Sequence, residues 1–277
     1  MTHEYNSMPK VIHYCWFGEN PLPDMAIKCI ESWKKFFPDY EIKEWNESNF
    51  DLACCDYVKE AYQSKKWAFV SDYARFWILY NYGGLYFDTD VEIIKDMTPI
   101  IENGAFMGCE TVDKCAPGLG LGVNPGLGLY KEILDDYESA HFIKTNGETD
   151  YTTVVDRVTD ILIRHGFVEK TEIQTVCGIT IYPPEYFCPL NYSTGVLNIT
   201  DNTVSIHHYT ESWHSWADRM IIKIERKFIN RFGNEKGKRY GRMFNLPFRV
   251  IAKFEKLGLK GTFLFVKNKG QSFFLWV

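Results

Sequence analysis

The stretch GGLYFDTDVEI, residues 83–93, alternates like a half-buried β-strand and yet contains two aspartates. Successive side chains of a strand point to opposite faces, so the apolar residues between Leu85 and Val91 are expected on one face. The other face is expected to carry Tyr86, Asp88, Asp90 and Glu92. Strands generally avoid aspartate, and burial of two acids requires a counter-charge. The stretch therefore predicts a strand that gathers carboxylates at a site.

Strand-like and helix-like segments alternate on both sides of this stretch, which predicts an α/β fold. The expected strands are residues 10–18, 40–45, 105–110 and 203–213. The expected helices are residues 24–36, 55–66, 69–82, 127–139 and 153–165, with Gly83 and Gly84 ending the third and Thr152 or Thr153 capping the last.

Composition predicts a folded domain with a substantial core. Of the 277 residues, 45% are apolar and 16% are aromatic, which is unlike a disordered chain. The eight cysteines form no CxxC pair and no zinc-like spacing with histidine, so we expect free thiols in a reducing compartment. No secretory signal pattern or run of about 20 apolar residues is found, which predicts a cytoplasmic protein.

The net charge of −5 is unevenly distributed along the chain. Residues 219–277 contain fifteen basic and three acidic residues, near +12, which leaves the rest near −17. We expect a domain at 1–218 and a basic, mostly helical extension at 219–277. Because its cations alternate with apolar residues, this extension predicts a peripheral contact with anionic membrane. The alternative is a solvated basic helix packed on an acidic body. Nucleic acid binding is not expected.

The glycine-rich segment KCAPGLGLGVNPGLGLY, residues 114–130, looks at first like a phosphate-binding loop. Its GxGxxG-like spacing lacks the context of such a loop, because it does not open a βαβ unit at the start of the chain. A mobile loop near a ligand is the preferred interpretation.

The pair Asp88 and Asp90 at the end of a strand suits a hard divalent cation, which takes oxygen ligands and can bridge a diphosphate. The same letters superficially match the first motif of haloacid-dehalogenase-type phosphatases, in which Asp88 would be the nucleophile. In those enzymes the motif lies near the start of the chain, whereas here it follows two strand and helix pairs. Sugar transfer from a nucleotide-diphosphate sugar is the second reaction class that fits such a metal.

Four segments together resemble a known family. PKVIHYCWFG (9–18), IESWKKFFPDYEIKEWN (30–46), SDYARFWILYNYGGLYFDTDVEI (71–93) and IHHYTESW (206–213) are similar to the DXD-containing glycosyltransferase family 32. That family contains capsular polysaccharide and Och1-like sugar transferases, and it is distantly similar to the glucosyltransferase domain of large clostridial cytotoxins. The resemblance implies a GT-A fold, a Rossmann-like mixed sheet flanked by helices, with Mn²⁺ or Mg²⁺ and retention of anomeric configuration.

The resemblance also assigns roles to residues at matching positions. Trp16 is expected to stack on the nucleotide base, with a core tryptophan as the alternative. Asp72 is expected to hold sugar hydroxyls and Arg75 to lie over the diphosphate, with an ordinary surface ion pair as the alternative. Asp88 and Asp90 are expected at the ribose and the metal. Tyr86, Ser212 and Trp213 complete the expected donor pocket.

The third metal ligand is the least determined of these roles. His207 and His208 are both available, and they point to opposite sides of a strand, so one of them is expected to serve. The resemblance favours His208, because a tyrosine follows it. Glu211 stands where the family pattern usually has glycine, and it is an alternative ligand.

The sequence therefore predicts a retaining, metal-dependent hexosyltransferase in capsular or surface polysaccharide biosynthesis. Its donor would be a nucleotide-diphosphate sugar, with UDP-sugars favoured and GDP-mannose open, and its acceptor a glycan or a lipid-linked saccharide. A sugar-nucleotide binding module without turnover is the alternative from another class.

Overall fold

The computed structural model describes residues 7–210, 215–252 and 254. They form two compact units. Unit 1 comprises residues through 190 together with 198–210, and unit 2 comprises residues 191–197 together with the described residues from 215 on. The expected boundary after residue 218 stays a prediction.

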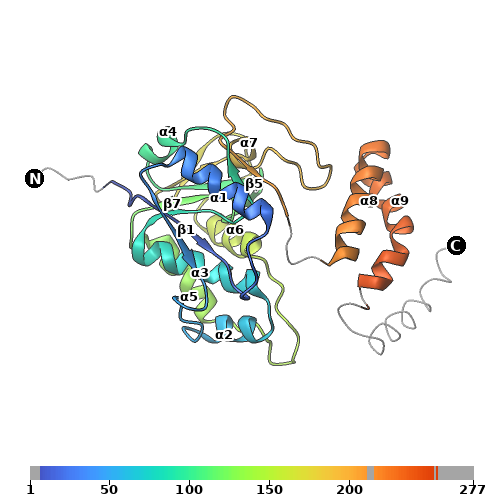
Figure 1. Ribbon diagram of the computed structural model, residues 1–277, viewed down its shortest axis with the longest axis horizontal. Helices are drawn as coiled ribbons and strands as arrows, with labels where there is room; N and C mark the ends of the chain where they lie inside the picture. Colours follow the sequence, from blue (N-terminus) through green and yellow to red (C-terminus); the bar gives the residue numbers. More distant parts are fainter. Residues whose placement is uncertain (1–6, 211–214, 253, 255–277) are drawn as a thin grey trace, which may run out of the picture. The chain divides into compact units, whose positions relative to one another are not determined.

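Unit 1 is an α/β unit (Figure 1). Its strands are β1 (Val11–Cys15), β2 (Glu41–Trp45), β3 (Gly84–Tyr86), β4 (Val91–Ile93), β5 (Phe106–Thr111), β6 (Lys114–Cys115), β7 (Leu121–Val123), β8 (Gln174–Val176), β9 (Ile179–Tyr182) and β10 (Ser205–His207). Its helices are α1 (Asp24–Phe36), α2 (Asp56–Gln63), α3 (Trp67–Tyr82), α4 (Thr98–Glu102), α5 (Gly128–Glu138), α6 (Val154–Arg164) and α7 (Pro184–Phe187).

The main sheet is mixed, with strand order β2-β1-β3-β7-β5-β9-β8 and β6 paired to β5. Strands β2, β1 and β3 are parallel, and β5 is parallel to β9. Strand β7 runs antiparallel to both of its neighbours, β3 and β5. A second sheet pairs β4 with β10 in antiparallel fashion. The predicted class, a mixed sheet flanked by helices, is confirmed.

Helices cover both faces of the main sheet (Figure 1). One core lies between the sheet and α2, α3, α5 and α6, and contains Tyr73, Phe76 and Met107. The other core lies against α1, α4 and α7, and contains Trp33 and Phe106. Neighbouring residues of β5, such as Phe106 and Met107, alternate between the two cores, as the pleat of a strand requires.

The long helices begin and end close to the predicted positions. Thr153 caps α6 by accepting a hydrogen bond from the backbone N–H of Asp156, as its residue type favours. Gly83, with φ of +65°, ends α3. All eight cysteines are free, in agreement with the prediction.

The aspartate stretch is not the single strand that its alternation predicts. It is divided into β3 and β4, which belong to different sheets. Between them the chain turns, because the N–H of Val91 donates to the carbonyl O of Asp88 (3.0 Å). Trp33 of α1 donates through Nε1 to the carbonyl O of Val91 (2.8 Å), and β4 pairs with β10. Asp88 and Asp90 therefore lie in a turn and not on one face of a strand.

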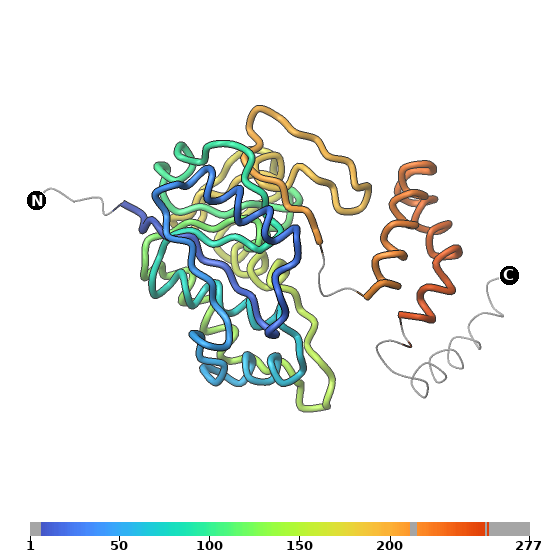
Figure 2. The backbone as a smooth tube through the Cα atoms, viewed as in Figure 1, coloured from blue at the N-terminus to red at the C-terminus, as the bar shows by residue number. Residues whose placement is uncertain are grey.

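The glycine-rich segment also differs from the predicted mobile loop. It contains β7, which is buried in the middle of the sheet, where Figure 2 allows the path of the chain to be followed. A Cβ on Gly122 would lie 2.2 Å from the ring of Phe106. Glycine is needed here because the strand passes directly under an aromatic ring.

The described residues of unit 2 from 216 on are mostly helical, as predicted for the basic segment. It contains α8 (Trp216–Phe232) and α9 (Asn234–Phe244), followed by helical residues 246–252. A capping box of Ser215 and Asp218 starts α8. Gly233, with φ of +78°, separates the two helices.

His13 is a buried titratable group in the centre of the sheet. It is 2% exposed, lies 3.0 Å from the carbonyl O of Gly83 through Nε2, and accepts from Trp45 Nε1 through Nδ1 (3.1 Å). Burial lowers the pKa of His13 to about 4, partly opposed by the bond to Gly83. The ring is therefore neutral in the folded protein.

We expect His13 to make the fold sensitive to mild acid. The unfolded ring takes up its proton near pH 6.5 and the folded ring near pH 4. The contribution of the neutral ring to stability is therefore fully present above pH 6.5 and is lost as the pH falls towards 4. Through His13 alone, the free energy of unfolding measured in urea should fall by about 2 kcal/mol between about pH 7 and pH 5. In the His13→Gln variant, the free energy of unfolding should fall by about 2 kcal/mol less over the same interval than in the unchanged chain. Equal falls in the two proteins would refute this.

Candidate functional site

Helix α3 presents two charged residues from an otherwise apolar surface. Asp72 is 8% exposed and Arg75 is 4% exposed. They are one turn apart, and Arg75 Nη2 lies 2.9 Å from Asp72 Oδ1. The alternative of an ordinary surface ion pair is therefore wrong, because both groups have left bulk water.

Arg75 joins α3 to the turn after β3. Its Nη2 also lies 3.2 Å from Asp88 Oδ1, and its guanidinium covers the ring of Tyr86 at 5.1 Å. The hydroxyl of Tyr86 donates to the same Asp88 oxygen (3.0 Å). Tyr86 is fully buried, so it supports Asp88 and Arg75 from beneath and does not form the pocket surface expected of it.

The burial of this group determines its charge. Burial raises the pKa of Asp72 to about 7, although Arg75 opposes the rise. Burial alone would lower the pKa of Arg75, but Asp88, Tyr86 and Asp72 outweigh it and raise that pKa. Arg75 therefore keeps its positive charge between carboxylates in a region of low dielectric, where such contacts are strong.

Gly118 lies directly against this group, and the sequence did not single it out. Its carbonyl O accepts from the N–H of Asp88 (3.0 Å). A Cβ on Gly118 would lie 2.0 Å from Asp88 Oδ2 and 3.4 Å from Arg75 Nη1. The glycine-rich segment therefore lies beside the site, as predicted. Gly118 is needed there because it packs closely against Asp88, and not because the segment is mobile.

Asp90 is held by a second set of donors. Its Oδ1 lies 3.1 Å from His207 Nε2, and its Oδ2 accepts from the backbone N–H (2.9 Å) and hydroxyl (3.1 Å) of Thr210. Burial opposes its ionisation, but His207 and Thr210 keep its pKa well below the usual value. Burial also lowers the pKa of His207, but Asp90 outweighs this effect and raises it to about 10.

The structure places His207 at Asp90, where the sequence favoured His208. Residues 205–207 pair with β4 so that His207 lies opposite Val91, and His208 then points to the other side. His208 Nε2 lies 2.7 Å from Glu92 Oε2, which also accepts from Lys28 (2.8 Å). Strand alternation predicted that one of the two histidines would serve, but the choice depends on the register with β4.

The remaining expected residues are placed as follows. Trp16 follows β1, is half-buried, and donates through Nε1 to the carbonyl O of Asn20 (2.6 Å), so its role in stacking stays a prediction. Ser212, Trp213 and the alternative ligand Glu211 lie outside the described residues.

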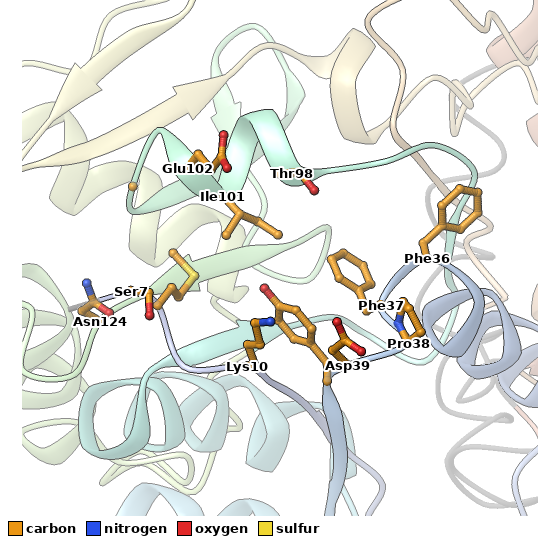
Figure 3. Close-up of a pocket in the computed structure, with 13 residues that line it drawn as sticks. Ser7, Lys10, Phe36, Phe37, Pro38, Asp39, Thr98, Ile101, Glu102 and Asn124 are labelled. Carbon is orange, nitrogen blue, oxygen red and sulfur yellow. The ribbon is translucent and has the colours of Figure 1, made fainter. Parts of the chain in front are cut away.

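A hollow of about 650 Å³ lies elsewhere on unit 1 (Figure 3). It is lined by residues before β1, after α1 and in α4, including Lys10, Phe37 and Ile101. Because β1 and β3 are parallel, this hollow lies at the amino ends of the strands, whereas Asp88 follows the carboxyl end of β3. The hollow is therefore not part of the candidate site.

A family model matches the part of the chain that contains most of this site. Residues 23–107 match the model described as "Glycosyltransferase sugar-binding region containing DXD motif". Asp72, Arg75, Asp88 and Asp90 all lie within the match. The resemblance to the DXD glycosyltransferases is confirmed. His207 and Thr210 lie beyond the matched residues and are brought to Asp90 by the fold.

Two relatives from Schizosaccharomyces pombe match part of the chain. Inositol phosphoceramide mannosyltransferase 3 is 30% identical over 110 residues, which are 38% of this chain and 31% of the relative. Inositol phosphoceramide mannosyltransferase 1 is 29% identical over 115 residues, which are 38% of this chain and 34% of the relative. The chain thus spans about a third of the length of these relatives.

Two solved structures match part of the chain. The PaToxG glycosyltransferase matches with a TM-score of 0.42 and 18% identity over 57% of this chain and 68% of its own. A glycosyltransferase involved in the glycosylation of the major capsid of PBCV-1 matches with a TM-score of 0.43 and 15% identity. This match covers 74% of this chain and 95% of that glycosyltransferase.

We expect Arg75 to be essential to the stability of unit 1. The Arg75→Met variant leaves Asp72 and Asp88 without their buried counter-charge and should lower the free energy of unfolding by about 3 kcal/mol. Adding Asp72→Asn should restore roughly 1 kcal/mol, because one uncompensated carboxylate is then removed. Chemical denaturation measures both values.

Arg164→Met is the matched control, because Arg164 is 59% exposed and lies 3.5 Å from Glu132. It should change stability by less than about 0.5 kcal/mol. Equal losses for Arg75→Met and Arg164→Met would contradict the assignment of a buried ion pair.

Proposed function

We propose that the protein is a metal-dependent glycosyltransferase that moves a hexose from a nucleotide-diphosphate sugar to a saccharide or lipid-linked acceptor. The observation that carries the proposal is that one buried cation, Arg75, holds Asp72 and Asp88 together beside the turn that also contains Asp90. This arrangement lies within residues that match a glycosyltransferase sugar-binding region. A phosphatase that uses Asp88 as nucleophile is disfavoured, because the motif follows two strand and helix pairs, β1–α1 and β2–α2, and does not lie near the start of the chain.

The residues fit a divalent cation such as Mn²⁺ or Mg²⁺. Asp90 Oδ1 and His207 Nε2 lie 3.1 Å apart. A carboxylate oxygen is an accepted ligand of Mn²⁺, and the imidazole of His207 would become a ligand on losing its proton to solvent as the cation binds. The bonds of Asp88 to Arg75 and Tyr86 both use Oδ1, which leaves Oδ2 on the side of Gly118. No preassembled cluster of three ligands is found among the described residues, so phosphate oxygens of the donor would complete the shell. A bound cation would balance charge on the departing diphosphate.

The chain's own side chains would orient the donor. Arg75, with its positive charge fixed by two carboxylates, stabilises negative charge that develops nearby. Asp72 accepts hydrogen bonds from sugar hydroxyls. We propose transfer with retention, in which the bond from the anomeric carbon to the phosphate oxygen breaks as the bond to the acceptor oxygen forms on the same face. The acceptor's proton passes to the departing phosphate oxygen.

The names of the two yeast relatives describe mannose transfer to inositol phosphoceramide, a lipid with an inositol phosphate head group. They support a lipid-linked or glycan acceptor and make GDP-mannose a donor to test beside UDP-sugars. Cytoplasmic assembly of a capsular or surface polysaccharide remains the proposed setting.

The function can be tested with the purified full-length chain. We expect release of nucleoside diphosphate from one of UDP-glucose, UDP-galactose, UDP-N-acetylglucosamine or GDP-mannose when Mn²⁺ is present. Chelation and Asp90→Asn should each abolish the release. Full activity in chelator would overturn metal dependence, and a metal-dependent rise in melting temperature without product would indicate a binding module.

We expect the two histidines to behave differently. His207→Ala removes a group at Asp90 and should weaken Mn²⁺ binding roughly tenfold or more. His208→Ala removes only a partner of Glu92 and is the matched control, with Mn²⁺ affinity expected to stay within about twofold. Titration calorimetry measures both, and the reverse order would return the ligand role to His208.

We expect Gly118 to be essential to the shape of the site. Gly118→Ala forces the carboxylate of Asp88 away from Arg75, since its methyl group would overlap Asp88 Oδ2. Turnover should fall roughly a hundredfold while the chain stays folded. Gly128→Ala is the control, because open space surrounds that position and its turnover should be unchanged. Normal turnover in Gly118→Ala would refute the placement of Asp88.

A further inference from the structure

The helices of unit 2 contact each other through small residues. Gly237 and Gly241 of α9 are buried against α8. A Cβ on Gly237 would lie 2.4 Å from the Cα of Ile229, and one on Gly241 would lie 2.9 Å from the Cγ of Glu225. The backbones therefore approach closely, and fully buried Asn245 extends the same interface. Such an interface leaves little interior space for large apolar side chains.

Large apolar side chains lie instead on the outside of these helices. We define the aromatic patch as Phe228, Phe232, Tyr240, Met243 and Phe244. Four of its members are exposed: 41% for Phe232, 38% for Tyr240, 65% for Met243 and 57% for Phe244. The rings of the four aromatic members form one cluster, with centroids 4.9 Å apart for Phe228 and Phe244 and 5.1 Å apart for Phe232 and Tyr240. A contiguous exposed apolar cluster of this kind marks an interaction surface.

Cations surround the aromatic patch. The described residues of unit 2 contain ten lysines and arginines against three acids. The guanidinium of Arg231 lies over the ring of Phe232 at 5.5 Å. Lys236 and Arg239 are exposed and precede Tyr240 and Met243 by one helical turn, which places them on the same side of α9. The partner must therefore combine an apolar layer with negative charge.

We propose that the aromatic patch and its cations bind the surface of an anionic lipid bilayer. Amphipathic helices with aromatic residues on one side and lysine or arginine beside them lie in the head-group region, where rings contact acyl chains and cations contact phosphates. No helix among the described residues is long and apolar enough to span a bilayer. This contact is independent of sugar transfer, and its test uses no donor.

Flotation of the full-length chain with lipid vesicles tests the proposal. The chain should float with vesicles of phosphatidylcholine and phosphatidylglycerol, and much less with phosphatidylcholine alone. Met243→Ser with Phe244→Ser should weaken binding roughly tenfold or more by removing apolar contact. Lys236→Gln with Arg239→Gln should weaken it by roughly fivefold for each cation removed, and only for the anionic vesicles.

Matched substitutions on unit 1 provide the controls. Ile163→Ser with Val168→Ser changes two residues that are each 55% exposed, and Lys35→Gln with Lys59→Gln removes two exposed cations. Both controls should float like the unchanged chain, and far-UV circular dichroism should show helices in every variant.

Three results would overturn the proposal: no flotation of the unchanged chain, equal flotation with both kinds of vesicle, or patch variants that float like the controls. Sedimentation velocity without lipid provides a further arm. If patch variants changed the oligomeric state and left vesicle binding intact, a second copy of the chain would be the partner in place of lipid.

Discussion

A guanidinium buried between two carboxylates determines how the site of unit 1 is arranged. Arg75 links Asp72 on its own helix to Asp88 in the turn after β3, and the ring of Tyr86 lies beneath it. In a region of low dielectric a single unpaired charge is costly, so the three groups are stable only together. Helix α3 and the end of β3 are thereby fixed in one relative position, and the turn containing Asp90 starts from this fixed point.

The two aspartates of the DXD motif have different environments despite their closeness in sequence. Asp88 is bound by side chains from α3 and β3, whereas Asp90 is bound by His207 and Thr210 from the far end of the chain. Each carboxylate thus has its own positive partner. Separate partners offset locally the repulsion between the two neighbouring acids.

Much of the fold was predictable, because it depends on local signals. The apolar spacing of α3, the glycines that end it, and the Thr153 cap all act over a few residues. The division of residues 83–93 into two strands was not predictable, because β4 contacts distant parts of the chain, namely Trp33 of α1 and strand β10. In the site, Asp72 and Arg75 were assigned from the resemblance to the DXD glycosyltransferases. The preference for His208 was misplaced and Gly118 was missed, since strand register and a 2.0 Å approach exist only in three dimensions.

The pairing of β4 with β10 has a consequence for synthesis of the chain. A nascent polypeptide that has emerged only as far as α7 already contains every residue that holds Asp88, but nothing yet pairs with β4 or faces Asp90. The part of the site around Asp90 is completed only by residues 198–210, which lie more than 100 positions after Asp90 in the chain. Until then the ribosome-bound intermediate exposes an unpaired strand edge, a feature that promotes aggregation. Maturation of the site is therefore a late event in the life of each molecule.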